Sequence, residues 1–282
     1  MLRFVLRKML HKKWLRAALL IGNILLIAIA AGSPMYTDAA LQRMLTDTMT
    51  DYVVQNGRYP TTAYLLSTLN PNAKTGSAAL NAFWEEDALA SRLPSQLDLP
   101  SRWLVRNIFL SDATIRPEEA RSNFRSKAVR LGFLSGLEEH ASIVSGRLYQ
   151  ERDDDIVEVV VSQKALISMN LMLGETYTVD KLTRPDGSPL RIQVVGIFDA
   201  ADSTDHYWYK SPSAYGDQLL MSEKAFTDLT GDLSGLPCKV MGLWFVIMDY
   251  EDISIDRAQE LYDASQALQA AHKQVNGISY SD

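Results

Sequence analysis

MLRFVLRKMLHKKWLR (residues 1–16) runs directly into AALLIGNILLIAIAAGSPMYT (residues 17–37), and this junction decides how the chain is built. The first stretch carries six basic and no acidic side chains, and the second carries no charged side chain. At a rise of about 1.5 Å per residue, a helix of this length reaches about 30 Å, the thickness of the hydrocarbon core of a bilayer. The sequence therefore predicts a transmembrane helix over residues 17–37.

The basic side chains of the first stretch predict the orientation of this helix. Lys and Arg residues are enriched on the cytoplasmic side of membrane helices, and Trp14 and Tyr36 stand where aromatic rings favour the two interfaces. We therefore expect residues 1–16 in the cytoplasm, the helix in the plasma membrane and residues 38–282 on the extracytoplasmic side. The basic side chains are Arg3, Arg7, Lys8, Lys12, Lys13 and Arg16.

The basic segment also has an apolar pattern of its own. Leu2, Val5, Leu6 and Met9 recur at three- and four-residue spacing, which is typical of a helix lying on a membrane surface or against a partner. A cleaved secretory signal is the alternative, because residues 28–30, Ala-Ile-Ala, resemble a cleavage site. Against it, the apolar run continues beyond that site to residue 37, and a signal needs no such helical order.

Charge and composition limit what the outer part can be. The whole chain has a net charge of −6, and because the first 16 residues contribute +6, residues 38–282 carry −12. Such an acidic domain argues against nucleic acid as a partner. Its length suffices for one large or two smaller globular units. Cys238 is the single cysteine and cannot form an intramolecular disulfide, so we expect it to be a small buried apolar side chain.

The pattern of apolar residues after the membrane helix alternates between helical and strand periods. We expect the membrane helix to continue as a stalk until Asn56-Gly57, and hairpins to occur alongside helical crossovers. This predicts a mixed α/β (α+β) extracytoplasmic domain on a single N-terminal helix. Further helices are expected at residues 77–93, closed by Pro94 and Pro100, at 163–171 and 223–230, capped by Ser162 and Ser222, and from Asp249 or Asp252 to about residue 274. Strands are expected at residues 64–69, 103–110, 124–134, 156–161, 176–179, 190–198, 218–221 and 240–248.

Catalytic signatures are lacking. The sequence has no G-x-x-x-x-G-K-[ST] phosphate loop, no H-E-x-x-H and no G-x-S-x-G, so we expect no enzymatic activity and no bound cofactor. Asp199, Asp202, Asp205 and His206 could hold a hard cation, but the spacing and the glycine of an EF-hand loop are absent. Solvated loop carboxylates are the favoured interpretation of this cluster.

Aromatic residues follow this acidic cluster. Tyr207, Trp208, Tyr209 and Tyr215 lie in a turn-rich segment that could form a recognition loop on the surface. The same residues could instead form a local aromatic core under a long loop. The sequence favours the second interpretation without excluding the first.

Four short motifs in the middle of the chain occur in a distinctive order. They are Gly146-Arg147, Glu158-Val-Val-Val-Ser162, Gly174-Glu-Thr176 and Val194-Val-Gly-Ile197. Glycine permits sharp turns at the first and third motifs, and inside a strand it indicates a bulge or a close backbone approach. Behind a basic N-terminal anchor, this ordered set resembles the extracytoplasmic core domain of FtsX-like, MacB-type ABC transporter permeases.

The resemblance implies a permease component that works with a separate cytoplasmic ABC ATPase, on which ATP binds, and with a second permease protomer. It implies that the basic segment contacts the membrane surface or the ATPase, although the charges could serve orientation alone. Such permeases usually have at least four membrane helices, and this chain shows one, so we expect a truncated or N-terminal part of a longer permease. A single-pass sensor or receptor, and a secreted binding protein with a cleaved signal, are the alternatives.

Overall fold

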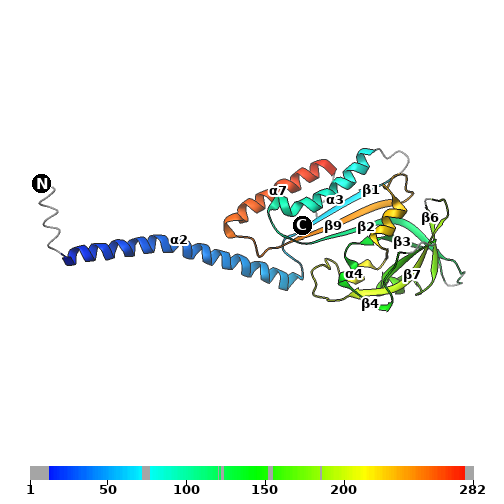
Figure 1. Ribbon diagram of the computed structural model, residues 1–282, viewed down its shortest axis with the longest axis horizontal. Coiled ribbons are helices and arrows are strands. Elements are labelled where there is room, and N and C mark those ends of the chain that lie inside the picture. Colours follow the sequence, from blue (N-terminus) through cyan, green and yellow to red (C-terminus); the bar gives the residue numbers. More distant parts are fainter. Residues whose placement is uncertain are drawn as a thin grey trace.

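The computed structural model describes residues 13–71, 77–119, 121, 124–151, 155–184 and 186–276, without the side chains of residues 13, 15, 16, 33, 34 and 271–276. These residues form a mixed α/β domain around a nine-stranded sheet, carried on one long N-terminal helix (Figure 1). The predicted fold class is thus confirmed.

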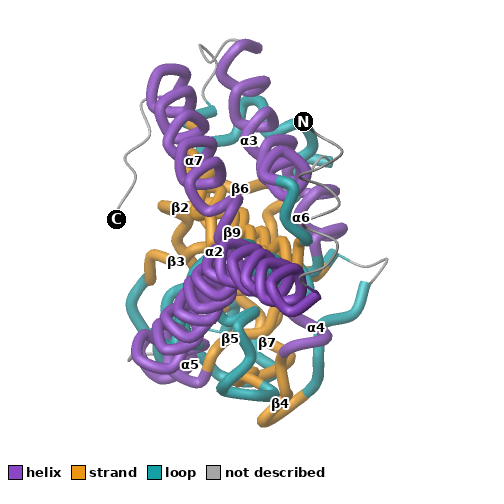
Figure 2. Tube along the Cα trace, turned by 90° about the vertical axis from the view of Figure 1, so that its left-hand side faces the viewer, coloured by secondary structure: helices purple, strands orange, loops and turns teal. Residues whose placement is uncertain are grey.

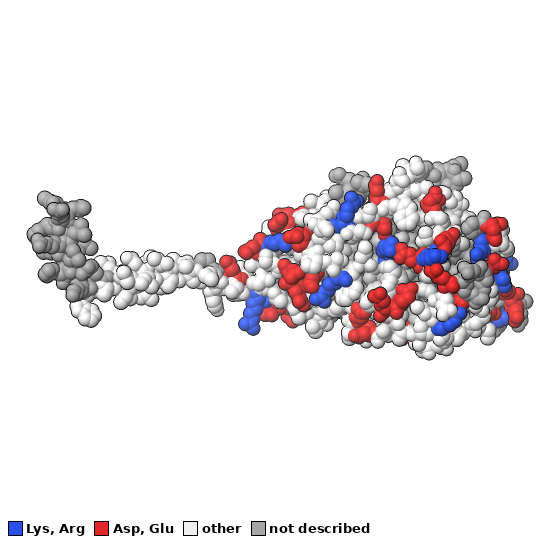
Figure 3. Space-filling view, viewed as in Figure 1, with Lys and Arg blue, Asp and Glu red and all other residues white. Residues whose placement is uncertain are grey.

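Helix α2 (Lys13–Asn56) joins the apolar segment to the domain without a break. Among the described residues it is the one helix that is long and apolar enough to cross a membrane, and Figure 3 shows no charged side chain along its apolar part. The helix ends where the sequence predicts, because Gly57 takes a left-handed φ of 62° and its N–H donates to the carbonyl of Val53. Residues 38–56 therefore form a helical stalk.

The sheet has the order β1-β9-β2-β3-β8-β5-β7-β4, and β6 pairs with both β2 and β7. These pairings close β2, β3, β8, β5, β7 and β6 into a ring, from which β9 and β1 extend on one side and β4 on the other. The β3–β8 and β5–β7 pairs are parallel and the others are antiparallel. The strands are β1 (Thr62–Leu69), β2 (Ser101–Pro117), β3 (Lys127–Leu134), β4 (Ala141–Gly146), β5 (Ile156–Ser162), β6 (Thr176–Thr183), β7 (Pro189–Ala200), β8 (Gln218–Leu220) and β9 (Lys239–Met248).

Two of the remaining helices lie side by side, as Figures 1 and 2 show, and the first of them packs against β1 and β9. They are α3 (Ser77–Leu97) and α7 (Ile255–Asn276). Shorter helices connect the strands: α4 (Leu137–His140), α5 (Gln163–Ser168), the 3-10 helix η1 (Pro212–Tyr215) and α6 (Glu223–Thr230). The predicted caps are confirmed, since Ser162 and Ser222 accept hydrogen bonds from the N–H groups three residues later.

Apolar side chains form two clusters on opposite faces of the strands. The larger contains Phe83 and Trp244 and fills the ring and the space under α3. The smaller contains Phe109 and Phe198 on the other face. The indole N–H of Trp244 donates to Asp87 at 2.7 Å, which satisfies its polar atom at the edge of the larger cluster.

The prediction that the helix beginning at residue 77 ends before Pro94 is wrong. Helix α3 continues to Leu97, with Pro94 buried in its last turn. The helix ends instead at Asp98, whose φ is 49°, and the N–H of Leu99 donates to the carbonyl of Pro94 at 2.9 Å. This six-to-one bond is a Schellman end, which depends on the conformation of Asp98 and cannot be inferred from the proline.

Two other boundaries differ from those expected. Strand β2 continues beyond the predicted end at Leu110, because an irregularity at Asp112, with φ 66°, absorbs the polar residues and lets pairing resume at Ala113. Helix α7 begins at Ile255 and at neither predicted aspartate. The carboxylate of Asp249 is instead held by Arg102 at 2.8 Å.

We predict that the thiol of Cys238 is unreactive in the native protein. Its side chain is 3% exposed, and burial raises its pKa, so little thiolate is available for attack. In detergent at mild alkaline pH, Ellman's reagent should label no thiol until guanidinium is added, and then one per chain. The matched control is Val144→Cys, at an exposed position, which should react at once. Rapid labelling of the native wild-type chain would contradict the burial.

Candidate functional site

The four motifs that the sequence singled out meet in the structure at β4, β5 and β7. Gly146 ends β4 with a φ of 77°, and a Cβ atom there would lie 2.2 Å from the carbonyl oxygen of Val195. A Cβ atom on Gly196 would lie 2.0 Å from the carbonyl oxygen of Arg147. The backbones therefore approach more closely than any side chain allows, and the predicted close approach at Gly196 is confirmed.

An ion pair closes this contact from the other side. The guanidinium of Arg147 donates to both oxygens of Glu158 at 2.5 Å each, and the N–H of Gln150 donates to the same carboxylate at 2.9 Å. The Glu158 carboxylate is buried, and the hydrogen bonds to it raise the pKa of Arg147. A buried carboxylate is tolerated when charged and polar donors surround it, so the first two motifs depend on each other. The four motifs together are called the motif unit below.

The third motif forms a second polar cluster at the start of β6. Gly174 has a φ of 83°, and its N–H donates to the carbonyl of Val194 at 2.7 Å. Next to it, Glu175 accepts a short hydrogen bond from Tyr177 and pairs with Arg121 at 2.9 Å. Burial, and then the hydrogen bond to Glu175, raise the pKa of the Tyr177 hydroxyl. The predicted turn at Gly174 is confirmed.

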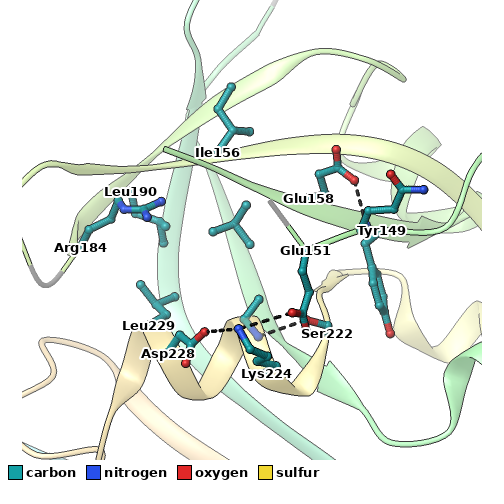
Figure 4. A pocket seen from close by; sticks show the side chains of 13 residues that line it. Tyr149, Glu151, Ile156, Glu158, Arg184, Leu190, Ser222, Lys224, Asp228 and Leu229 are labelled. Atoms are coloured by element: carbon teal, nitrogen blue, oxygen red, sulfur yellow. Dashed lines mark hydrogen bonds and ion pairs between the residues drawn. The ribbon is translucent and has the colours of Figure 1, made fainter. Parts of the chain in front are cut away.

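A pocket of about 240 Å³ lies between this motif unit and helix α6 (Figure 4). Glu158 and Tyr149 line one side of it, and Leu229 and Asp228 the other. On its α6 side, Lys224 contacts Asp228 at 2.9 Å and Glu151 at 3.4 Å, and these bonds raise the pKa of the lysine. The hydroxyl of Tyr149 points away from this lysine and donates to Glu138 at 2.6 Å.

The polar groups on the α6 side of the pocket are already engaged. The Ser222 hydroxyl accepts the capping bond of α6, and Lys224 links two carboxylates. The volume is also below the range of about 300–1,000 Å³ typical of small-molecule sites. Among the residues that the structure describes, no group of three His, Cys, Asp or Glu side chains is placed to hold a metal ion. The arrangement joins α6 to the motif unit and offers no nucleophile paired with a base.

The predicted aromatic loop residues lie in the smaller apolar cluster. Tyr207 and Tyr215 are buried, and Trp208 and Tyr209 are half-buried. The Tyr207 hydroxyl donates to the carbonyl of Ser135 at 2.8 Å, and burial raises its pKa. The geometry is that of an aromatic core under a loop. Recognition of a partner through these residues stays a prediction.

The acidic residues before this loop are dispersed. Asp205 contacts Nδ1 of His140 at 2.6 Å, and that imidazole stacks on the Tyr207 ring with centroids 3.8 Å apart. The Asp202 carboxylate accepts bonds from Thr204 of its own turn, which lower its pKa. The contact of His140 with Asp205 was not predicted, because 65 residues separate the two and no periodicity relates them.

The stalk is fixed to the domain at one polar contact and one apolar face. Gln42 donates to the carbonyl of Ile253 at 2.9 Å and accepts from the N–H of Ile255 at 2.6 Å, so it holds the start of α7. Leu45, Met49 and Val53 pack against the larger apolar cluster at helical spacing. Gln42 therefore ties the first turn of α7 to the stalk about five residues beyond the predicted membrane segment of α2.

The predicted membrane or ATPase contact lies outside the described part of the chain. Arg3, Arg7, Lys8 and Lys12 precede the first described residue, and the side chains of Lys13 and Arg16 are likewise not described. Their role stays a prediction. The described neighbours Trp14 and Tyr36 are exposed, as are the described apolar side chains between them, and their placement at membrane interfaces stays a prediction.

Comparisons with known proteins give a distant likeness. No protein-family model matches the chain, and no curated protein matches it. A solved structure that is similar is the crystal structure of a domain of a "putative Permease protein" from Porphyromonas gingivalis. It shares 13% sequence identity and a TM-score of 0.35, over 75% of this chain and 85% of that chain. A similarity of this size carries no conclusion about function.

We predict that two glycine substitutions in the motif unit differ in cost. Gly196→Ala should lower the free energy of unfolding by about 3 kcal/mol, because the new methyl group overlaps backbone that cannot move aside. At Gly174 a methyl group would have open space, but the backbone has a positive φ. Gly174→Ala should therefore lower the free energy of unfolding by about 1 kcal/mol. Guanidinium unfolding of the full chain in detergent measures both. Equal costs would show that β4 and β7 can separate freely.

We predict that removing one partner of the ion pair is worse than removing both. Arg147→Met leaves the Glu158 carboxylate buried without its strongest donor, whereas the double variant with Glu158→Met leaves no buried charge. The double variant should therefore unfold at a higher guanidinium concentration than Arg147→Met. Arg147→Lys, which keeps the charge but loses the two-pronged geometry, should lie between wild type and Arg147→Met. A double variant less stable than Arg147→Met would contradict this account.

Proposed function

We propose that this chain is a permease component of an ABC transporter of the FtsX-like, MacB-type kind. It would work with a separate cytoplasmic ATPase and a second permease protomer, and it would transmit movement between the membrane and its outer domain. The observation that carries the proposal is the continuous helix α2, which passes through the predicted membrane segment and continues as the stalk that packs on the domain.

The length and attachment of α2 support a mechanical role. A helix of 44 residues extends about 66 Å. A small tilt of its membrane end therefore moves its outer end over a large distance, so the helix can act as a lever. Gln42 and the apolar face of the stalk connect that lever to α7 and the larger cluster. A flexible tether would have served an independent binding domain equally well.

The motif unit supports the same proposal from the domain side. The four sequence motifs that resemble the permease family fasten strands together. Three of them join β4, β5 and β7 through close backbone approach and one buried ion pair. The Gly174 motif joins the start of β6 to β7 through the hydrogen bond from Gly174 to Val194. Residues that stiffen a domain are what a force-transmitting part requires, and such a domain needs no cofactor of its own.

We predict that an ABC ATPase co-purifies with the full chain when it is extracted from its native membrane in mild detergent. Vanadate-sensitive ATP hydrolysis and mass spectrometry identify the subunit. If the basic segment forms the contact, the double variant Arg7→Gln with Lys8→Gln should retain several-fold less ATPase than wild type. Its four remaining cations should still keep the membrane orientation, so the loss would report the contact alone. The control Lys181→Gln, on strand β6, should retain the wild-type amount.

The alternatives give different results in the same preparation. A mature N-terminus near Ala31, found by N-terminal sequencing, would replace the proposal with a secreted binding protein. An intact membrane-bound chain that retains no ATPase would favour a single-pass sensor. Retention of the ATPase by the Arg7 and Lys8 variant at the wild-type level would leave the permease proposal in place and assign these charges to orientation alone.

A further inference from the structure

Strand β1 is an open edge of the sheet. It pairs with β9 over eight residues, Thr62–Leu69, and among the described strands none pairs with its other side. The N–H of Met248 donates to the carbonyl of Thr61, so residues 61, 63, 65 and 67 turn their backbone toward β9. The N–H and C=O groups of Tyr64 and Leu66 therefore point outward along the edge.

This edge lacks the features that keep exposed strands from pairing. The sequence TAYLLSTL contains no charged residue and no proline, and its register with β9 is regular throughout. Natural proteins usually protect such an edge with charge, proline or a bulge. An unprotected regular edge is a template for another strand.

A groove follows the first half of this edge. It has a volume of about 380 Å³, and Leu89 and Leu93 of α3 and Leu268 of α7 form its apolar wall. Tyr64 and Tyr209 line it as well, stacked with their ring centroids 5.9 Å apart. Backbone donors and acceptors beside apolar walls are the two elements of β-strand addition, in which main-chain bonds give affinity and the walls receive alternate side chains.

The charge of the groove indicates the partner. Among the described residues that line it none is acidic, although residues 38–282 carry a net charge of −12. The guanidinium of Arg58 lies 5.5 Å from the Tyr209 ring centre, and Lys210 lies 6.0 Å from that of Tyr64. A strand that ends in acidic residues complements this end of the groove.

A second copy of this chain fits the edge less well. In a two-fold pair of β1 edges the strands run antiparallel, so the basic end of each strand, at Arg58 and Lys210, faces the uncharged far end of the other copy's β1. Self-pairing therefore supplies no carboxylate for either cation. The charge pattern therefore favours a different chain over a homodimer.

From these features we infer that the β1 edge is a docking site for an extended segment of a partner protein, with alternating apolar side chains and an acidic end. The segment adds a strand to β1 by hydrogen bonds to Tyr64 and Leu66, and its acidic end lies at Arg58 and Lys210. Docking of this kind is independent of the proposed ATPase contact, which involves the basic residues at the N-terminal end of the chain.

The test measures binding of a defined peptide to the full chain in detergent. The probe is a fluorescein-labelled octapeptide of alternating valine and threonine that ends in two glutamates, followed by fluorescence anisotropy. We expect saturable binding, and at least tenfold weaker binding of the same peptide methylated on alternate backbone nitrogens, because those donors no longer reach the edge. Arg58→Glu should weaken binding about fivefold.

Two variants separate the edge from general surface effects. Leu66→Pro removes an outward N–H and leaves the bonds to β9, so it should abolish binding while circular dichroism and the unfolding midpoint show a folded chain. Lys181→Glu, on the distant strand β6, carries the same charge change as Arg58→Glu and should bind the peptide as wild type does.

Three results would overturn the inference. Absence of peptide binding excludes the proposed strand addition. Equal binding of the methylated and unmethylated peptides shows that the groove takes apolar surface without reading a strand. A dimer in analytical ultracentrifugation that Leu66→Pro dissociates shows that the edge belongs to a second copy.

Discussion

The contact between Arg147 and Glu158 sits where strands β4, β5 and β7 depend on one another. Strand β7 pairs with β4, β5 and β6, so its position decides theirs. At Gly196 the backbone of Arg147 occupies the place of a side chain, and the parallel pairing of β5 with β7 shifts by one residue between Val159 and Val160. The close approach keeps Arg147 next to Glu158, so the guanidinium satisfies the carboxylate although it is buried. The glycine allows the short distance between the two backbones, and the ion pair favours this register of β5 beside β4 and β7.

The stalk extends this rigidity toward the membrane. Thr46 and Thr50 turn their hydroxyl groups back to carbonyls four residues earlier in the helix, so the polar side of α2 is satisfied without the domain. The apolar side is not, and its residues pack on the larger cluster. A helix that needs the domain on one face only can extend beyond the domain as a continuous helix. That geometry suits a connection that carries movement, because bending it would expose the packed face.

Local signals in the sequence found the elements whose causes are local. Ser162 and Ser222 were predicted as caps because a hydroxyl before a helix satisfies a free N–H, whatever surrounds it. The helix end predicted at Pro94 was wrong, because burial of the last turn of α3 outweighed the backbone hydrogen bond that a proline cannot donate. The motif glycines were predicted as architectural positions. The contact that joins two of the motifs was not predicted. The Arg147 and Glu158 side chains meet through strand pairing, and no periodicity connects two residues on different strands.

The two edges of the sheet differ in how they meet solvent, and the difference bears on their use. Strand β4 has six residues, a register shift between Ile143 and Ser145, and the tight glycine contact at its end, so it offers little regular backbone to another chain. Strand β1 is longer and regular, and an apolar groove runs beside it. A sheet under pressure only to avoid aggregation would protect both edges. Protection of one edge and an apolar groove along the other are what a domain needs if it joins a partner strand on one side only.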